Sequence, residues 1–196
     1  MKKFLTSLIF LLSFTAPAFA HLNPAEHGSF SAGFTHPIFG MDHVLVMFAV
    51  GLWAWQIGGK AIVAVPSAFV AAMIVGFALS LLGAPLPFVE PTILASVVAL
   101  GLLLTFAVKL PSTTGAVLVG AFALFHGHAH GSELGGATAL SYALGFALAT
   151  ATLHAGGIAL GLTIDKLFGT KNQTAIALSR AVGGMTVFAG LSLFFA

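Results

Sequence analysis

Six apolar segments, joined by short links that contain Gly, Pro and Ser, constrain the fold of this chain more than any other feature. A helix needs about 20 mostly apolar residues to cross about 30 Å of hydrocarbon. Only 6% of the residues are charged, against about 25% in a soluble domain, so a soluble globule and a disordered chain are both excluded. The sequence predicts an all-α fold, a polytopic transmembrane helical bundle with about six spans, at residues 37–56, 61–82, 91–110, 113–131, 137–164 and 175–195.

The first 20 residues have the pattern of a signal peptide. Lys2 and Lys3 form a positive n-region, residues 4–14 are apolar, and the small residues Ala18 and Ala20 suit a cleavage site. We therefore expect a signal peptide at residues 1–20 and a six-helix transmembrane domain at residues 21–196. The alternative is an uncleaved first helix, which the short apolar core disfavours.

The basic residues indicate the orientation of the spans. A cleaved signal peptide leaves the new N-terminus in the periplasm, and the links then alternate between the two sides of the membrane. On this layout all five remaining basic residues lie at cytoplasmic ends, as the positive-inside rule requires: Lys60, Lys109, Lys166, Lys171 and Arg180. We expect a multi-pass protein of the bacterial inner membrane. Five basic and five acidic residues then remain, and this zero net charge gives no indication of nucleic-acid binding.

Because the chain has no cysteine, a metal site can use only His, Asp, Glu and Met side chains. The first candidate motif contains His36, Asp42 and His43, with Pro37 at the expected first position of a helix. On one straight helix His36, His43 and Met47 share a face, although Met47 is more typical of packing. An ionisable residue inside a span is a functional candidate, because it costs at least about 2.5 kcal/mol to insert. The alternative is that Asp42 and His43 only satisfy each other.

The second candidate motif ends the predicted fourth span. His126 and His130 are four residues apart and share a helix face, whereas His128 points elsewhere unless the neighbouring glycines unwind the helix. Glu133 follows shortly after and adds a carboxylate. Three histidines within five residues predict metal binding, and a proton path lined by histidines is the alternative.

Depth in the membrane relates the two motifs. By the helical rise, His43 lies about 10 Å and His126 about 7 Å below the outer ends of their spans. We therefore expect Asp42, His43 and His126 at one shared site, with His36 and His130 nearer its outer mouth. His154 lies deeper, in the fifth span, where it suits a second ligand position; a hydrogen bond to a neighbouring helix is nearly as good an explanation. Neutral imidazole with a carboxylate suits nickel, cobalt or zinc.

The first motif resembles the signature of a known family. The run His36-Pro37-x-x-Gly40-x-Asp42-His43-x-x-x-Met47-x-x-Val50-Gly51-x-x-Ala54 is similar to that of the HupE/UreJ family of nickel permeases, and the signal peptide, six spans and His-rich fourth span fit the same family. The resemblance implies a transporter of nickel, or of cobalt, from periplasm to cytoplasm that supplies hydrogenase or urease maturation. His36, Asp42 and His43 match the family motif directly, so the resemblance implies that they bind the metal. His126, His128 and His130 match only as a His-rich segment.

On this interpretation Ni²⁺ or Co²⁺ is the transported substrate, no cofactor is permanently bound, and the chain is not an enzyme. The sequence has no P-loop, so a gradient, the membrane potential or an energising partner would drive transport. The sequence does not decide whether the chain forms a homo-oligomer. The alternatives are a membrane-embedded metalloenzyme that uses the same histidines, and an accessory protein or sensor that binds metal without transporting it.

Overall fold

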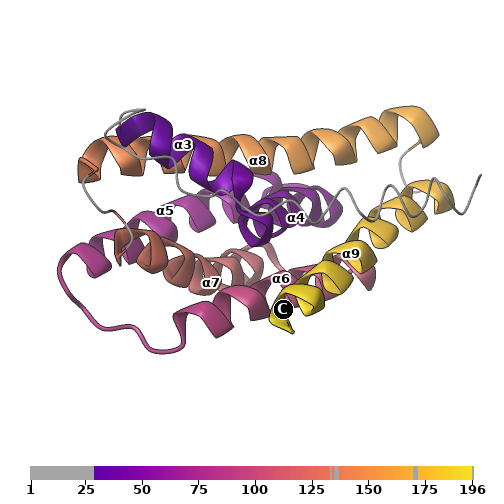
Figure 1. Ribbon diagram of the computed structural model, residues 1–196. Coiled ribbons are helices and arrows are strands. Elements are labelled where there is room, and N and C mark those ends of the chain that lie inside the picture. The colour runs from indigo at the N-terminus through magenta and orange to yellow at the C-terminus, as the bar shows by residue number, and fades with distance from the viewer. Residues whose placement is uncertain (1–28, 133, 135–136, 170–171, 196) are drawn as a thin grey trace, which may run out of the picture.

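The computed structural model describes residues 29–132, 134, 137–169 and 172–195, and the predicted signal peptide lies outside this part of the chain. The described residues form seven α-helices and the structure is all-helical, as the sequence predicts (Figure 1). Their bounds are α3 Ser29–Phe39, α4 Met41–Ile57, α5 Ala61–Leu81, α6 Val89–Thr105, α7 Ser112–Ser132, α8 Ala139–Phe168 and α9 Gln173–Phe194.

Three helices, α5, α8 and α9, are long and apolar enough to cross a membrane, and α3 with α4 forms a fourth candidate span that is bent by 79°. Helix α6 is also apolar but has only 17 residues. Helix α7 has 21 residues, three of which are histidines, and it is not among these candidate spans. The chain is thus a helical membrane protein, and the count of six spans remains a prediction.

The predicted first span differs most from the structure. Residues 37–56 are not one straight helix that starts at Pro37, because α3 begins at Ser29 and contains Pro37 inside it. The helix is interrupted at Gly40, whose backbone is extended, and α4 starts at Met41. Pro37 lacks an N–H and so weakens the last turn of α3, which makes a break three residues later inexpensive.

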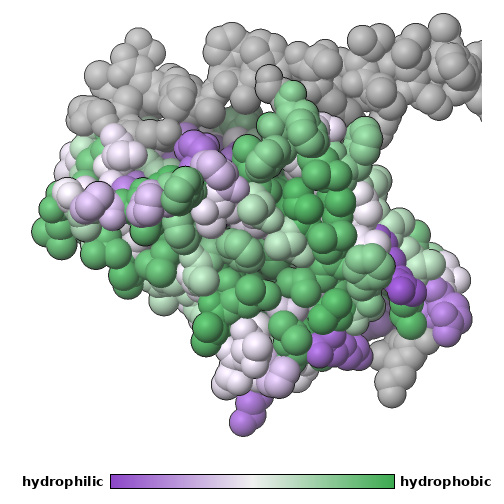
Figure 2. Space-filling model, turned by 90° about the horizontal axis from the view of Figure 1, so that it is seen from below, coloured by the Kyte–Doolittle hydropathy of each residue, from purple (hydrophilic) through white to green (hydrophobic). Residues whose placement is uncertain are grey.

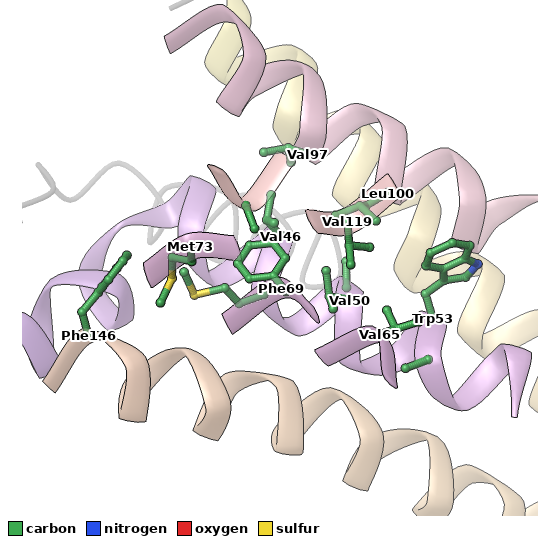
Figure 3. Close-up of a cluster of buried hydrophobic side chains, with 14 of the residues drawn as sticks. Val46, Val50, Trp53, Val65, Phe69, Met73, Val97, Leu100, Val119 and Phe146 are labelled. Atoms are coloured by element: carbon green, nitrogen blue, oxygen red, sulfur yellow. The ribbon is translucent and has the colours of Figure 1, made fainter. Parts of the chain in front are cut away.

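Helix α4 is the central element of the bundle. It contacts α3, α5, α6, α8 and α9, and its residues 46, 47 and 49–54 are all buried. Figure 1 shows α4 between α8 and the group of α6 and α7. The core around it is apolar, with Trp53, Phe69 and Met73 fully enclosed (Figure 3). The outer surface is also largely apolar: hydrophobic residues cover most of the face in Figure 2, and hydrophilic ones gather toward its edges. Such a surface suits a lipid environment.

Glycines allow the helices to approach closely where they cross. A Cβ atom at Gly51 of α4 would overlap the carbonyl oxygen of His154 in α8, and one at Gly157 of α8 would overlap that of Phe48. The same reciprocal arrangement joins α5 and α7 through Gly76 and Gly127. In lipid, where the hydrophobic effect does not drive helix association, such close packing contributes much of the stability.

Candidate metal centre

Three histidines from three helices form a buried cluster: His36 of α3, His43 of α4 and His130 of α7. We call it the outer triad, after the side of the membrane on which the predicted orientation of the spans would place it. Each histidine offers a ring nitrogen within 4.8 Å of those of the other two, and no ion is present. The ring centroids are 4.4 Å apart for His36 and His130 and 4.5 Å apart for His43 and His130. A divalent ion bound by imidazoles has metal–nitrogen distances of about 2.0–2.1 Å. Small rotations of the rings would therefore bring all three nitrogens onto one ion.

The break at Gly40 brings His36 and His43 together. Seven residues on a straight helix span about 10 Å along its axis, yet the ring centroids of His36 and His43 are only 5.6 Å apart. A side chain at position 40 would also crowd the site, since a Cβ atom there would lie 3.0 Å from His43 Nδ1 and 3.3 Å from Asp42 Oδ1. Gly40 thus allows the chain to bend and leaves room for the side chains of Asp42 and His43.

Asp42 orients the ring of His43. The His43 Nδ1–H donates to Asp42 Oδ1 at 2.8 Å, because a carboxylate can only accept. This bond leaves the lone pair on His43 Nε2, which meets His130 Nε2. A histidine held by a carboxylate through one nitrogen while the other faces the ligand position is the usual arrangement at protein metal sites. Because His43 Nε2 carries a lone pair, His130 Nε2 is the donor in this contact.

His126 lies beside the triad. Its ring centroid is 5.2 Å from that of His43, so the predicted neighbourhood of His43 and His126 is present in the structure. The predicted arrangement was nevertheless wrong in detail: His36 and His130 stand with His43 in one cluster, while His126 Nε2 faces Ser96 Oγ at 3.1 Å. The predicted depths assumed a straight first span. The bend between α3 and α4 changes which histidines lie together.

The remaining predicted ligands lie elsewhere. Helix α7 is continuous to Ser132, so the proposed unwinding that would turn His128 inward is wrong; His128 Nε2 donates to the carbonyl oxygen of Ala84 at 2.8 Å. Glu133 lies outside the described residues. His154 is buried in α8, and its Nδ1 donates to the carbonyl oxygen of Met47 at 2.6 Å.

Sequence reasoning missed three side chains that surround these histidines. Ser96 of α6 contacts His126, Phe69 of α5 lies against both His126 and His154, and the Phe146 ring of α8 packs 4.4 Å from that of His130. Ser96 could have been identified from the sequence, because it is a polar residue inside an otherwise apolar span. The two phenylalanines gave no such signal, because nothing distinguishes them from packing residues.

Comparisons with known proteins agree with the architecture. Residues 9–193 match the family described as HupE / UreJ protein. The chain is also 43% identical over 185 residues to Protein HupE of Rhizobium leguminosarum bv. viciae, an alignment that covers 93% of this chain and 94% of the relative. No solved structure matches the chain. The family match and this level of identity show that the chain belongs to the HupE/UreJ family.

Proposed function

We propose that the protein transports Ni²⁺, or Co²⁺, from the periplasm to the cytoplasm and so supplies the maturation of a metalloenzyme such as a hydrogenase or urease. The observation that carries this proposal is the outer triad, three buried imidazoles on three helices with one of them oriented by a carboxylate. Membership in the HupE/UreJ family, whose nickel-permease motif this sequence resembles, supports the proposal.

The ligand set suits a borderline divalent metal. Neutral imidazoles bind nickel, cobalt and zinc well, and this chain has no thiolate that would favour Cu(I). Asp42 places a negative charge next to His43, which offsets part of the cost of a dication in a medium of low dielectric constant. A bound ion would take the place of the proton that lies between His43 Nε2 and His130 Nε2, and metal binding would release that proton.

Uptake of radioactive nickel into proteoliposomes tests the proposal. In His43→Asn the side-chain amide occupies the position of Nδ1 and can still donate to Asp42, whereas the ligand nitrogen Nε2 is lost. We expect time-dependent nickel accumulation by the unaltered chain and at least a tenfold slower initial rate in the variant. Thr163→Val is a matched control, because the exposed Thr163 hydroxyl bonds only to Ala159 of its own helix.

The assay separates transport from the alternatives. Nickel that binds without accumulating over time would identify a binding accessory or sensor and contradict the transport proposal. Equal uptake by the unaltered chain and His43→Asn would show that the triad does not handle the ion. Competition by cobalt and zinc in the same vesicles measures the selectivity.

A further inference from the structure

Below the outer triad, His126 is fixed in one tautomer. Ser96 has a single hydroxyl proton, and it donates this proton to the carbonyl oxygen of Ile93 at 2.6 Å. The Ser96 oxygen can therefore only accept in its 3.1 Å contact with His126, so His126 Nε2 carries the proton. The lone pair then lies on His126 Nδ1, which is fully buried and has no hydrogen-bond partner among the described residues.

His154 is fixed in the opposite tautomer. The backbone carbonyl of Met47 accepts from His154 Nδ1 at 2.6 Å, so Nδ1 carries the proton and the lone pair lies on Nε2. The side chain is 1% exposed, and its Nε2 also has no partner among the residues that the structure describes. The alternative from sequence, a histidine satisfied by a neighbouring helix, explains only one of the two ring nitrogens. A buried acceptor without a partner costs about 1–3 kcal/mol, so its retention needs an explanation.

Phe69 packs against both of these histidines. Its ring centroid is 5.7 Å from that of His126 and 5.0 Å from that of His154, and the ring is fully buried in the core drawn in Figure 3. On the outer side, His126 contacts His43 of the triad. The ring contacts therefore form a continuous series from His43 through His126 and Phe69 to His154. This series crosses from α4 and α7, through α5, to α8.

We propose that His154 is an inner binding point for the transported divalent cation, that His126 passes the ion to it from the outer triad, and that the Phe69 ring separates the two. This inference rests on the proposed transport function. Each histidine along the path presents an unprotonated nitrogen because a fixed acceptor holds the proton on the other nitrogen: Asp42 for His43, Ser96 for His126 and the Met47 carbonyl for His154. Two buried lone pairs without partners among the described residues, on two histidines that both contact Phe69, are expected of ligand positions that a mobile ion visits in turn.

The absence of cysteine from the chain allows a spectroscopic test that does not depend on transport. A single thiolate bound to Co²⁺ gives a charge-transfer absorption in the near ultraviolet that imidazole does not give. We expect this band when Co²⁺ is added to purified His154→Cys. The matched control is Thr152→Cys, two residues away on α8, where the side chain is exposed and bonds only to Leu148 of its own helix. A band of equal strength in both variants, or in neither, would overturn the inner binding point.

Transport by His154→Asn gives a second, independent readout. The Asn amide can keep the donation to Met47 while the ligand nitrogen is lost, so the fold is retained. We expect nickel binding at equilibrium to stay within twofold of the unaltered chain, because the outer triad is intact, while uptake falls at least tenfold. Uptake at the unaltered rate would refute the role of His154. If the unaltered chain itself accumulates no nickel, the transport proposal fails, and the cobalt band still decides whether an ion reaches position 154.

Discussion

The contact between α5 and α7 depends on Gly127, and a single methyl group there should separate the two helices. A Cβ atom at Gly127 would overlap the carbonyl oxygen of Met73 and would lie 2.7 Å from its carbonyl carbon and 2.9 Å from the backbone nitrogen of Phe77. All three obstacles are backbone atoms, which cannot rotate away as a side chain can. Ordinary contact begins at 3.4 Å, so the carbon alone requires a shift of about 0.7 Å.

The expected cost follows from two opposing contributions. Forcing extra volume into a packed interior costs about 1–3 kcal/mol, and backbone obstacles favour the upper end of this range. Alanine is the better helix former by about 0.8–1 kcal/mol, which offsets part of the cost. Gly127→Ala should therefore lower the free energy of unfolding by about 2 kcal/mol. It should also weaken nickel binding, because α7 carries both His126 and His130 on either side of the substitution.

Gly120, seven residues earlier on the same helix, is the matched control. A Cβ atom at Gly120 would meet only the Cβ of Ala72 at 3.6 Å and the carbonyl of Ala68 at 3.9 Å, both ordinary contacts. Gly120→Ala should thus be neutral or stabilise by up to about 1 kcal/mol. Reversible unfolding of the two purified variants in mixed micelles, followed by circular dichroism, measures the difference. Equal stability of Gly120→Ala and Gly127→Ala would refute the packing argument.

Three further predictions concern the histidines. Uptake should decrease at acid external pH, because protons compete with the metal ion for the imidazole nitrogens. Rates compared at pH 7.5 and pH 5 check this, and an unchanged rate at pH 5 would count against imidazole ligands. His128→Gln should keep nickel uptake within about twofold, since the Gln amide can still donate to the Ala84 carbonyl; a large loss of uptake would favour the unwound helix that the sequence suggested. Ser96→Ala removes the acceptor that fixes the His126 tautomer and should slow uptake about three- to tenfold, since one hydrogen bond contributes about 0.5–1.5 kcal/mol; Ser96→Thr keeps the hydroxyl and should restore the rate.

The bounds of some helices could be predicted closely from the sequence because they depend on local properties. Segments 61–82 and 113–131 correspond to α5 and α7 within one residue at each end. Apolar length decides where such helices run, and Gly, Pro and polar residues decide where they end. The two histidine motifs could be identified for the same reason, since ionisable groups inside an apolar segment stand out from their surroundings.

The grouping of the ligands could not be predicted, because it depends on one backbone break and on contacts between distant segments. The motif itself favours a single straight helix, in which Pro37 is acceptable at the start and Gly40 is one small residue among several. The outer triad exists because the chain bends by 79° at that glycine and because α7 brings His130, almost 90 residues later, into contact with His43. Likewise, the orphaned nitrogens of His126 and His154 follow from acceptors on other helices, and no spacing within α7 or α8 encodes them.

The charge balance among the described residues of the site favours passage of an ion over storage. The triad ligands are neutral, and Asp42 supplies one negative charge within the described part of the site. A bound dication would therefore leave an excess of about one positive charge in a medium of low dielectric constant, which limits the affinity. A conducting path needs such moderate binding at several successive positions, strong enough to admit the ion and weak enough to release it. A second carboxylate beside His126 or His154 would strengthen binding at that position and trap the ion, whereas the described hydrogen-bond partners of these two histidines are the Ser96 hydroxyl and the Met47 carbonyl.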